Sequence, residues 1–447
     1  MGLSAQGAGL PILLWVLLWG NYNSGPWHLK SVPQTGIDWM NASRAAIPFL
    51  VLPGALALWR KRGGAARRVA PAHVWAVYAG LCFLFGLVGE ADAFSAVYWT
   101  TAYLAAVVIV LAGLQGDDVA SAAAFNRVTW LLAALVVTVL AIVARDVLVK
   151  GEGLDASGYG VIGRIPTVAG MVMSRATGMA RFAAVPGLVG FGLALRGRGV
   201  WRIFGAAVFV GGAVFMYIMQ SRGATAGYAA ASLLMVWFSS RRGWIAGVAI
   251  GVAIAGAVAL NAVPEEVLSH LARGQSAEEM KSMPGRMRPW ENALKEMAKN
   301  PVLGHGFEAD RWLIGEHVHN TYMYALVAGG AVGLVVFVVG LVWAWVLFGR
   351  LILNPAVGAL GQGLTLLQAG GVFAFFTVRS IPEVCGSNYA VDYLVMLPAM
   401  MYFHVLWHRV RAMQQVVRPG LQVQVSLERA ASGRRTQTGA CGGARQS

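Results

Sequence analysis

The side chains best suited to chemistry are arginines that stand at the edges of apolar segments. Arg222 lies in Ser221-Arg222-Gly223, between two apolar stretches that almost no loop connects, and Arg286 and Arg288 precede a short helical pattern. A guanidinium group can donate two hydrogen bonds to a phosphate and stays charged at any relevant pH. These positions therefore suit ligands for a phosphate or pyrophosphate. For Arg222 the alternative is a helix-end side chain whose charge reaches the membrane surface.

Two histidines follow these arginines, in Glu316-His317-Val318-His319-Asn320. A neutral imidazole beside an anion site is suited to take a proton from an attacking hydroxyl group. Zinc binding is the alternative, but His317 and His319 have neither a cysteine partner nor HExxH spacing. We therefore expect a general base here and no metal site.

The composition places these residues in a membrane protein. The 447 residues are 57% hydrophobic and only 12% charged, and the mean hydropathy is +0.61, whereas soluble domains carry roughly 25% charged residues. This excludes a soluble enzyme fold. The net charge of +15 comes from basic residues beside apolar runs, so membrane lipids, and not nucleic acid, are their expected partners.

The apolar runs predict an all-α polytopic membrane protein with about twelve transmembrane helices. The predicted spans are residues 8–21, 44–59, 72–88, 95–114, 128–144, 182–195, 202–220, 225–238, 244–263, 321–348, 357–377 and 390–407. The chain then divides into helices one to nine (1–263), a long outer loop (264–320), helices ten to twelve (321–408) and a basic cytoplasmic tail (409–447). We expect this tail to be disordered, because it lacks an apolar period.

The basic residues also orient the spans, since Lys and Arg are enriched in cytoplasmic loops. Clusters in 60–68, 196–202, 241–242 and 408–411 fall on one face when the spans are counted. Both termini are then cytoplasmic, and loops 145–181 and 264–320 lie outside. This orientation leaves five arginines on the outer side, where we expect an anion to justify them: Arg175, Arg181, Arg222, Arg286 and Arg288.

The outer loop 264–320 carries its own helix signal. Pro289 suits a first helical turn, and Trp290, Leu294 and Met297 recur at helical spacing up to residue 300. We predict a short amphipathic helix on the outer surface, with these three side chains against the spans or the lipid headgroups. Two acidic pairs, in 90–92 and 308–310, are expected to be solvated loop residues, with Mg²⁺ or Mn²⁺ binding as the alternative.

Four motifs together resemble a known family. They are Ser221-Arg222-Gly223, Gly285-Arg286 followed by Trp290, Pro-Val-Leu-Gly-His-Gly in 301–306, and His317-Val318-His319-Asn320-Thr321-Tyr322. Over residues 219–335 the chain resembles the O-antigen ligase and polymerase superfamily, and Arg175-Ala176-Thr177-Gly178 is similar to an upstream motif. The resemblance implies a GT-C-like glycosyltransferase of the bacterial inner membrane, with its active site facing the periplasm.

The resemblance also implies the substrates. A polysaccharide linked to undecaprenyl pyrophosphate would pass to the lipid A-core oligosaccharide, without a cofactor and with inversion. Arg222 and Arg286 would hold the pyrophosphate, and His319 would act at the acceptor hydroxyl group. Further candidates for substrate binding are Arg288, His317, Arg175, Arg181, Asn320 and Trp290.

Three other functions remain open. An O-antigen polymerase, or a ligase that moves glycans to protein Ser or Thr, would use much the same site. A solute or lipid transporter would also have many spans and arginines at their edges. The chain shows no inverted repeats and no charged residues near mid-span, which argues against a transporter.

Overall fold

The computed structural model describes residues 9–21, 39–61, 69–88, 93–114, 118–143, 176–219, 221–239, 286–299 and 301–438. Every regular element in these ranges is a helix. The helices are α1 (Gly9–Trp19), α3 (Trp39–Lys61), α4 (Pro71–Val88), α5 (Ala93–Gly113), α6 (Val119–Val143), α8 (Ala176–Arg196), α9 (Val200–Ile218), α10 (Arg222–Ser239), α14 (Met287–Lys299), α15 (Ala309–Leu313), α16 (Thr321–Ile352), α17 (Pro355–Ala359), α18 (Gly363–Arg379) and α19 (Val391–Thr438).

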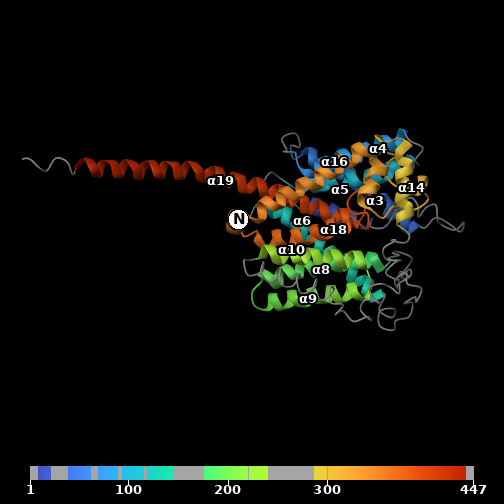
Figure 1. Ribbon diagram of the computed structural model, residues 1–447, viewed down its shortest axis with the longest axis horizontal. Coiled ribbons are helices and arrows are strands. Elements are labelled where there is room, and N and C mark those ends of the chain that lie inside the picture. Colours follow the sequence, from blue (N-terminus) through green and yellow to red (C-terminus); the bar gives the residue numbers. More distant parts are fainter. Residues whose placement is uncertain are drawn as a thin grey trace, which may run out of the picture.

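The long helices lie side by side in a bundle, and α14 lies across one end of it (Figure 1). We call this end the α14 end. In the bundle α8 packs on α9, α10 on α18, and α16 on α4. Helix α19 leaves the bundle at the other end (Figure 1).

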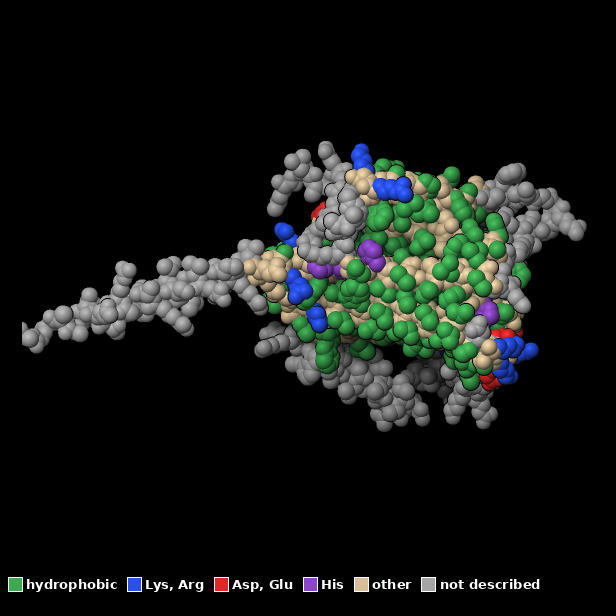
Figure 2. Space-filling model, turned by 90° about the horizontal axis from the view of Figure 1, so that it is seen from above, with side chains coloured by type: hydrophobic (Ala, Val, Ile, Leu, Met, Phe, Trp, Pro, Cys, Tyr) green, Lys and Arg blue, Asp and Glu red, His purple; other side chains and the backbone are tan. Residues whose placement is uncertain are grey.

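Among the described residues, six helices are long and apolar enough to cross a membrane. Their apolar segments are Pro71–Val88, Ala93–Gly113, Val119–Val139, Gly178–Arg196, Val200–Ile218 and Thr321–Ile352. The outer faces suit lipid, since Trp201, Ile203 and Phe204 are each more than half exposed, and hydrophobic side chains cover most of the face in Figure 2. The structure also has helices at the other predicted spans. The exception is 244–263, which lies outside the described residues. The all-helical, multi-spanning fold is thus confirmed in outline, while the total of twelve spans stays a prediction.

Two helices extend furthest beyond the predicted spans. Helix α6 begins at Val119, ahead of the predicted start at 128, because Asp118 Oδ1 caps it by accepting from two N–H groups of its first turn at 3.0 and 3.3 Å. The tail was expected to be disordered, but α19 continues as a helix to Thr438. Extending a packed helix costs less than nucleating a new one. Residues 439–447 lie outside the described part of the chain.

The predicted surface helix forms as α14, with a different buried face. Pro289, Ala293 and Met297 are buried, at a spacing of four residues, and Leu294 is 53% exposed. Leu294 is therefore outside the buried stripe, and the predicted alternative, that it faces the lipid headgroups, stays a prediction. The small side chain of Ala293 takes its place in the stripe, because it lies on the same helix face as Pro289 and Met297.

A kink in α16 docks the loop that follows α14. Gly330 has φ 64° and ψ −171°, a backbone region open only to glycine. The kink frees the carbonyl groups of Val327 and Ala328, which accept hydrogen bonds from the N–H groups of His305 and Gly306 at 3.0 and 2.9 Å. The Gly-His-Gly segment is thus held against α16 by backbone hydrogen bonds.

Buried tyrosines fix the loop between α18 and α19 at the same end of the bundle. The Tyr78 and Tyr103 hydroxyl groups donate to the carbonyl oxygens of Ser387 and Gly386, each at 2.9 Å. Tyr103 also stacks on Tyr393 of α19, with ring centroids 3.9 Å apart. Since these hydrogen bonds are buried, they satisfy loop carbonyl groups that water cannot reach.

We expect Gly330→Ala to lower the stability of the protein by on the order of 1–3 kcal/mol, because alanine is strained in this conformation. An added Cβ would also lie 2.2 Å from the Val302 carbonyl oxygen. The measurement is the apparent Tm of the purified protein in detergent. Gly349→Ala in the same helix is the control, since its Cβ would meet no atom within 4 Å. Equal Tm values for the two variants would contradict the prediction.

Candidate functional site

A carboxylate from the loop between α18 and α19 joins two of the predicted catalytic residues. Glu383 Oε2 lies 3.2 Å from His319 Nδ1, and Glu383 Oε1 lies 3.4 Å from Arg286 Nη2. The Thr321 hydroxyl group donates to the backbone oxygen of Glu383 at 2.9 Å and so holds it in place. Segments as far as 97 residues apart in the chain thus meet at one carboxylate.

The charge of Glu383 determines which nitrogen of His319 carries a proton. Burial raises the pKa of Glu383, but the hydrogen bond with His319 and the charges of Arg379 and Arg286 outweigh burial and lower the pKa to about 2. At neutral pH this carboxylate is ionised and can only accept hydrogen bonds. His319 Nδ1 must therefore donate to it. In a neutral imidazole, Nε2 is then left to accept a proton.

Arg222 lies close to Arg286 at the α14 end of the bundle. It is the first residue of α10, ahead of the predicted span 225–238, and burial together with the charge of Arg286 lowers its pKa. Two guanidinium groups in this arrangement repel each other, and an anion bound by both removes the repulsion. Arg222 is thus near Arg286, which Glu383 links to His319, and the role of the three side chains as a catalytic group stays a prediction.

The backbone of His319 is strained, and its neighbours hold it. Its φ of 44° lies in the left-handed region, which residues other than glycine rarely adopt. Val318 beside it donates to Asp310 Oδ2 at 3.1 Å and accepts from Trp290 Nε1 at 2.6 Å. Strain of this kind persists only where the surroundings fix the backbone, and it is common at functional sites.

Asn320 and Trp290, both predicted as substrate ligands, serve the backbone in the structure. Asn320 Oδ1 accepts from two N–H groups in the first turn of α16, and its Nδ2 donates to the Ile381 carbonyl oxygen at 2.8 Å. Trp290 uses its only side-chain donor on Val318. Both residues therefore position His319, and a direct contact with substrate stays a prediction.

A buried ionic network lies next to His319. His317 Nδ1 is 2.7 Å from Asp310 Oδ2, Arg311 Nε donates to Glu308 Oε2 at 2.8 Å, and the rings of His317 and His319 are 4.8 Å apart. Glu308 and Asp310 are only 4% and 1% exposed. The expectation that this acidic pair is solvated is therefore wrong, because each carboxylate is buried against a basic partner. The other pair, in 90–92, lies outside the described residues.

The two histidines have different environments. Burial lowers the pKa of His317, but its hydrogen bond and ionic interaction with Asp310 outweigh burial, and the pKa is raised. A raised pKa favours the charged imidazolium, which cannot accept a proton. His317 is therefore the poorer candidate for a base and His319 the better one.

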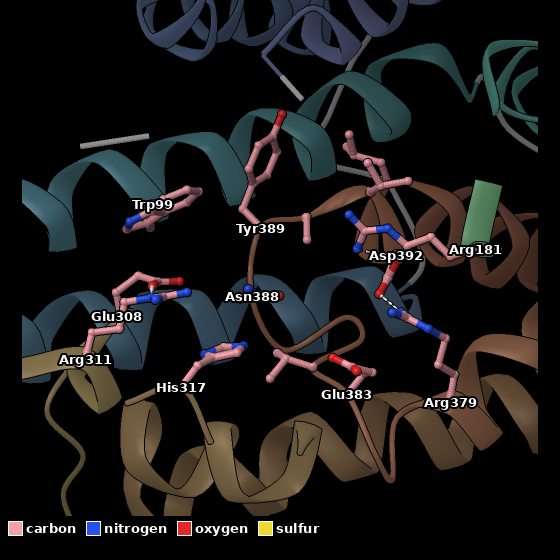
Figure 3. Close-up of a pocket in the computed structure, with 14 residues that line it drawn as sticks. Trp99, Arg181, Glu308, Arg311, His317, Arg379, Glu383, Asn388, Tyr389 and Asp392 are labelled. Carbon is pink, nitrogen blue, oxygen red and sulfur yellow. Dashed lines mark hydrogen bonds and ion pairs between the residues drawn. The ribbon is translucent and has the colours of Figure 1, made fainter. Parts of the chain in front are cut away.

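A cavity of about 220 Å³ lies beside this network (Figure 3). Glu383 and His317 form part of its wall, together with Trp99 of α5 and Asn388 and Tyr389 of the loop after α18. Across the cavity in Figure 3, Asp392 of α19 pairs with Arg181 at 3.0 Å and with Arg379 at 2.5 Å. The residues that line the cavity thus come from distant parts of the chain, from α5 to α19.

The remaining predicted ligands lie elsewhere. Arg181 lines the cavity and pairs with Asp392, whereas Arg286 and His319 share Glu383. Arg288 is exposed on α14 and forms no hydrogen bond or ion pair with the described residues. Arg175 is outside the described part of the chain.

The sequence reasoning missed the partners of the predicted residues. Glu383, Asp392 and Arg379 line the cavity but were not singled out. A signal was present, because all three stand in or beside the short connection between two strongly apolar predicted spans. Ionisable groups in such a place are costly and mark functional sites.

The fold and site together define a multi-spanning membrane protein with cationic and histidine side chains gathered at one end of its bundle. Residues 206–338 match the family model described as O-antigen ligase. The match confirms the resemblance seen in the motifs and points to a glycosyltransferase-like enzyme of O-antigen and lipopolysaccharide synthesis. It includes Arg222, Arg286 and His319 but ends before Glu383. No curated protein and no solved structure matches the chain.

We expect the Tm difference between wild type and Glu383→Gln to shrink as the pH falls from 4.5 towards 2. The folded-state pKa of about 2 lies below the ordinary value of 4.5, so the ionised carboxylate stabilises the fold above pH 4.5 and loses this effect as it is protonated. Thermal unfolding between pH 7 and 2 measures the difference. Glu291→Gln, on the exposed side of α14, is the control. A difference that stays constant over this range would contradict the prediction.

Proposed function

We propose that the protein is an O-antigen ligase. It transfers a polysaccharide from undecaprenyl pyrophosphate to a hydroxyl group of the lipid A-core oligosaccharide. The observation that carries this proposal is the Glu383 carboxylate, which joins Arg286 to His319 beside Arg222. Cations for a pyrophosphate and a base for a hydroxyl group are the two requirements of such a transfer.

In the proposed step, the acceptor oxygen attacks the anomeric carbon of the donor sugar. The bond from this carbon to the pyrophosphate oxygen breaks, and the electron pair leaves with undecaprenyl pyrophosphate. Negative charge grows on the leaving group, where Arg222 and Arg286 stabilise it without a divalent metal. The acceptor proton passes to His319 Nε2. One displacement of this kind inverts the anomeric centre.

Glu383 is a positioning residue in this scheme. It holds the Nδ1–H side of His319 and thereby directs Nε2 towards the acceptor. It also stabilises the imidazolium that forms as the proton is transferred. Because Oε1 contacts Arg286 at 3.4 Å, the same carboxylate keeps the base and one pyrophosphate ligand in register.

The proposed location is the bacterial inner membrane, with the α14 end facing the periplasm. This orientation is supported by the basic clusters in 60–68 and 196–202, which the positive-inside rule assigns to the cytoplasm. Arg196 agrees with it, since it is the last residue of α8, at the end remote from Arg181, and donates to the carbonyl oxygens of Gly363 and Phe238. The donor lipid then reaches the site from the outer leaflet.

The test is transfer by the purified protein in liposomes, with a polyprenyl-pyrophosphate glycan as donor and lipid A-core and a second repeat unit as competing acceptors. We expect transfer to lipid A-core, unaffected by EDTA. Arg286→Ala and His319→Ala should lower kcat by roughly 10²–10⁴-fold, and Glu383→Gln should lower kcat more than it changes KM.

Lys295→Ala is the matched control, because it removes an exposed cation from α14, the helix that Arg286 precedes. It should leave transfer unchanged. Transfer to the repeat unit instead of lipid A-core would assign the chain as a polymerase. Full activity of Arg286→Ala would remove that residue from the mechanism. Unaltered transfer by Glu383→Gln would remove the positioning role of the carboxylate.

A further inference from the structure

The cavity in Figure 3 is one side chain away from the proposed base and from Arg286, because Glu383 of its wall contacts both. Its wall includes Glu383, which contacts His319, and His317, whose ring lies 4.8 Å from that of His319. Neither Arg222 nor Arg286 lines it. A molecule in this cavity therefore lies close to the base and to Arg286, on a surface to which neither Arg222 nor Arg286 contributes a side chain.

The cations of the cavity wall are already paired with carboxylates. Arg181 and Arg379 bind Asp392, Arg311 binds Glu308, and His317 binds Asp310. A phosphate is bound best by cations that are not already neutralised. The cavity therefore favours an uncharged polar ligand, and the phosphate groups of the donor are better placed at Arg222 and Arg286.

Asn388 shows which kind of group this ligand carries. Its Oδ1 is fully buried and has no hydrogen-bond partner among the described residues, and Asn388 lines the middle of the cavity in Figure 3. A buried acceptor without a donor destabilises the protein. A ligand hydroxyl group supplies the missing donor.

The walls and size of the cavity suit one sugar ring. Trp99 and Tyr389 lie side by side, with ring centroids 6.2 Å apart, and both line the cavity. Aromatic rings of this kind pack against the carbon face of a sugar while nearby polar groups bind its hydroxyls. The volume of about 220 Å³ is below the roughly 300–1,000 Å³ of pockets for drug-sized ligands, so a single ring fits better than an oligosaccharide or a lipid chain.

We propose that this cavity binds the terminal, uncharged sugar ring of the acceptor, and that Asn388 determines acceptor specificity by accepting a hydrogen bond from one of its hydroxyl groups. The inference rests on the proposed transfer at His319 and names the part of the substrate that is bound there.

The first experiment measures KM for each substrate with the purified full-length protein in liposomes. Asn388→Ala should raise KM for the acceptor about 10-fold, while KM for the donor and kcat change less than about two-fold. Ala390→Leu tests the same site differently, because Ala390 lines the cavity and a larger side chain fills it. It should raise the acceptor KM as well.

Asn354→Ala is the control, because it removes the same amide group from the cap of α17, outside the cavity. It should leave the acceptor KM unchanged. Each variant is used only if its apparent Tm is close to that of wild type, and the two cavity variants provide independent readings. A rise in the donor KM, or an unchanged acceptor KM in both cavity variants, overturns the proposal.

A binding measurement separates this inference from the proposed function. Saturation-transfer NMR with lipid-free core oligosaccharide and the protein in nanodiscs should show contacts to the terminal ring in wild type and not in Asn388→Ala. If the ring binds but wild type transfers no glycan, the proposed function fails and the cavity assignment stands. If wild type transfers glycan but the ring gives no contacts, the cavity assignment fails alone.

Discussion

The site depends on one partly buried carboxylate that is shared by two basic groups. Glu383 contacts Arg286 and His319 through different oxygen atoms, and the low pKa of this carboxyl group keeps it ionised at neutral pH. An isolated ionised group at this depth would be costly, and the shared contacts offset that cost. The same contacts fix the direction of the imidazole and the position of the guanidinium group.

Rigid backbone contacts support this arrangement from two sides. The kink at Gly330 docks the segment after α14 on α16, and buried tyrosines hold the carbonyl groups of the loop after α18. Glu383 lies on the second of these loops, and His319 lies in the connection between α15 and α16; neither is in a helix. Precise geometry on loops requires such support, because loop backbone is otherwise the least constrained part of a fold.

Charge compensation divides the α14 end into two kinds of environment. Around the cavity, Asp392 and Glu308 neutralise neighbouring arginines, which leaves a polar surface with little net charge. At Arg222 and Arg286, two guanidinium groups repel each other, and Arg286 shares its carboxylate with His319. An anion and an uncharged sugar are therefore favoured at different places within reach of one base.

The sequence alone determined the features that depend on local pattern and composition. The apolar runs predicted the helices, Pro289 and the following periodicity predicted α14, and the motifs led to Arg222, Arg286 and His319. Each of these patterns is local in the sequence, so it can be recognised without knowing which distant segments pack together. The continuation of α19 to Thr438 was missed, because helix extension depends on what precedes the segment.

Only the tertiary structure decided which groups meet. Glu383 is 64 residues from His319 and 97 from Arg286 along the chain, and no local pattern links them. The structure likewise paired Arg181 with Asp392 and left Arg288 exposed, although the sequence treats these arginines alike. The physical reason is that the strength of an ionic contact depends on distance and burial, and both are set by how distant helices pack.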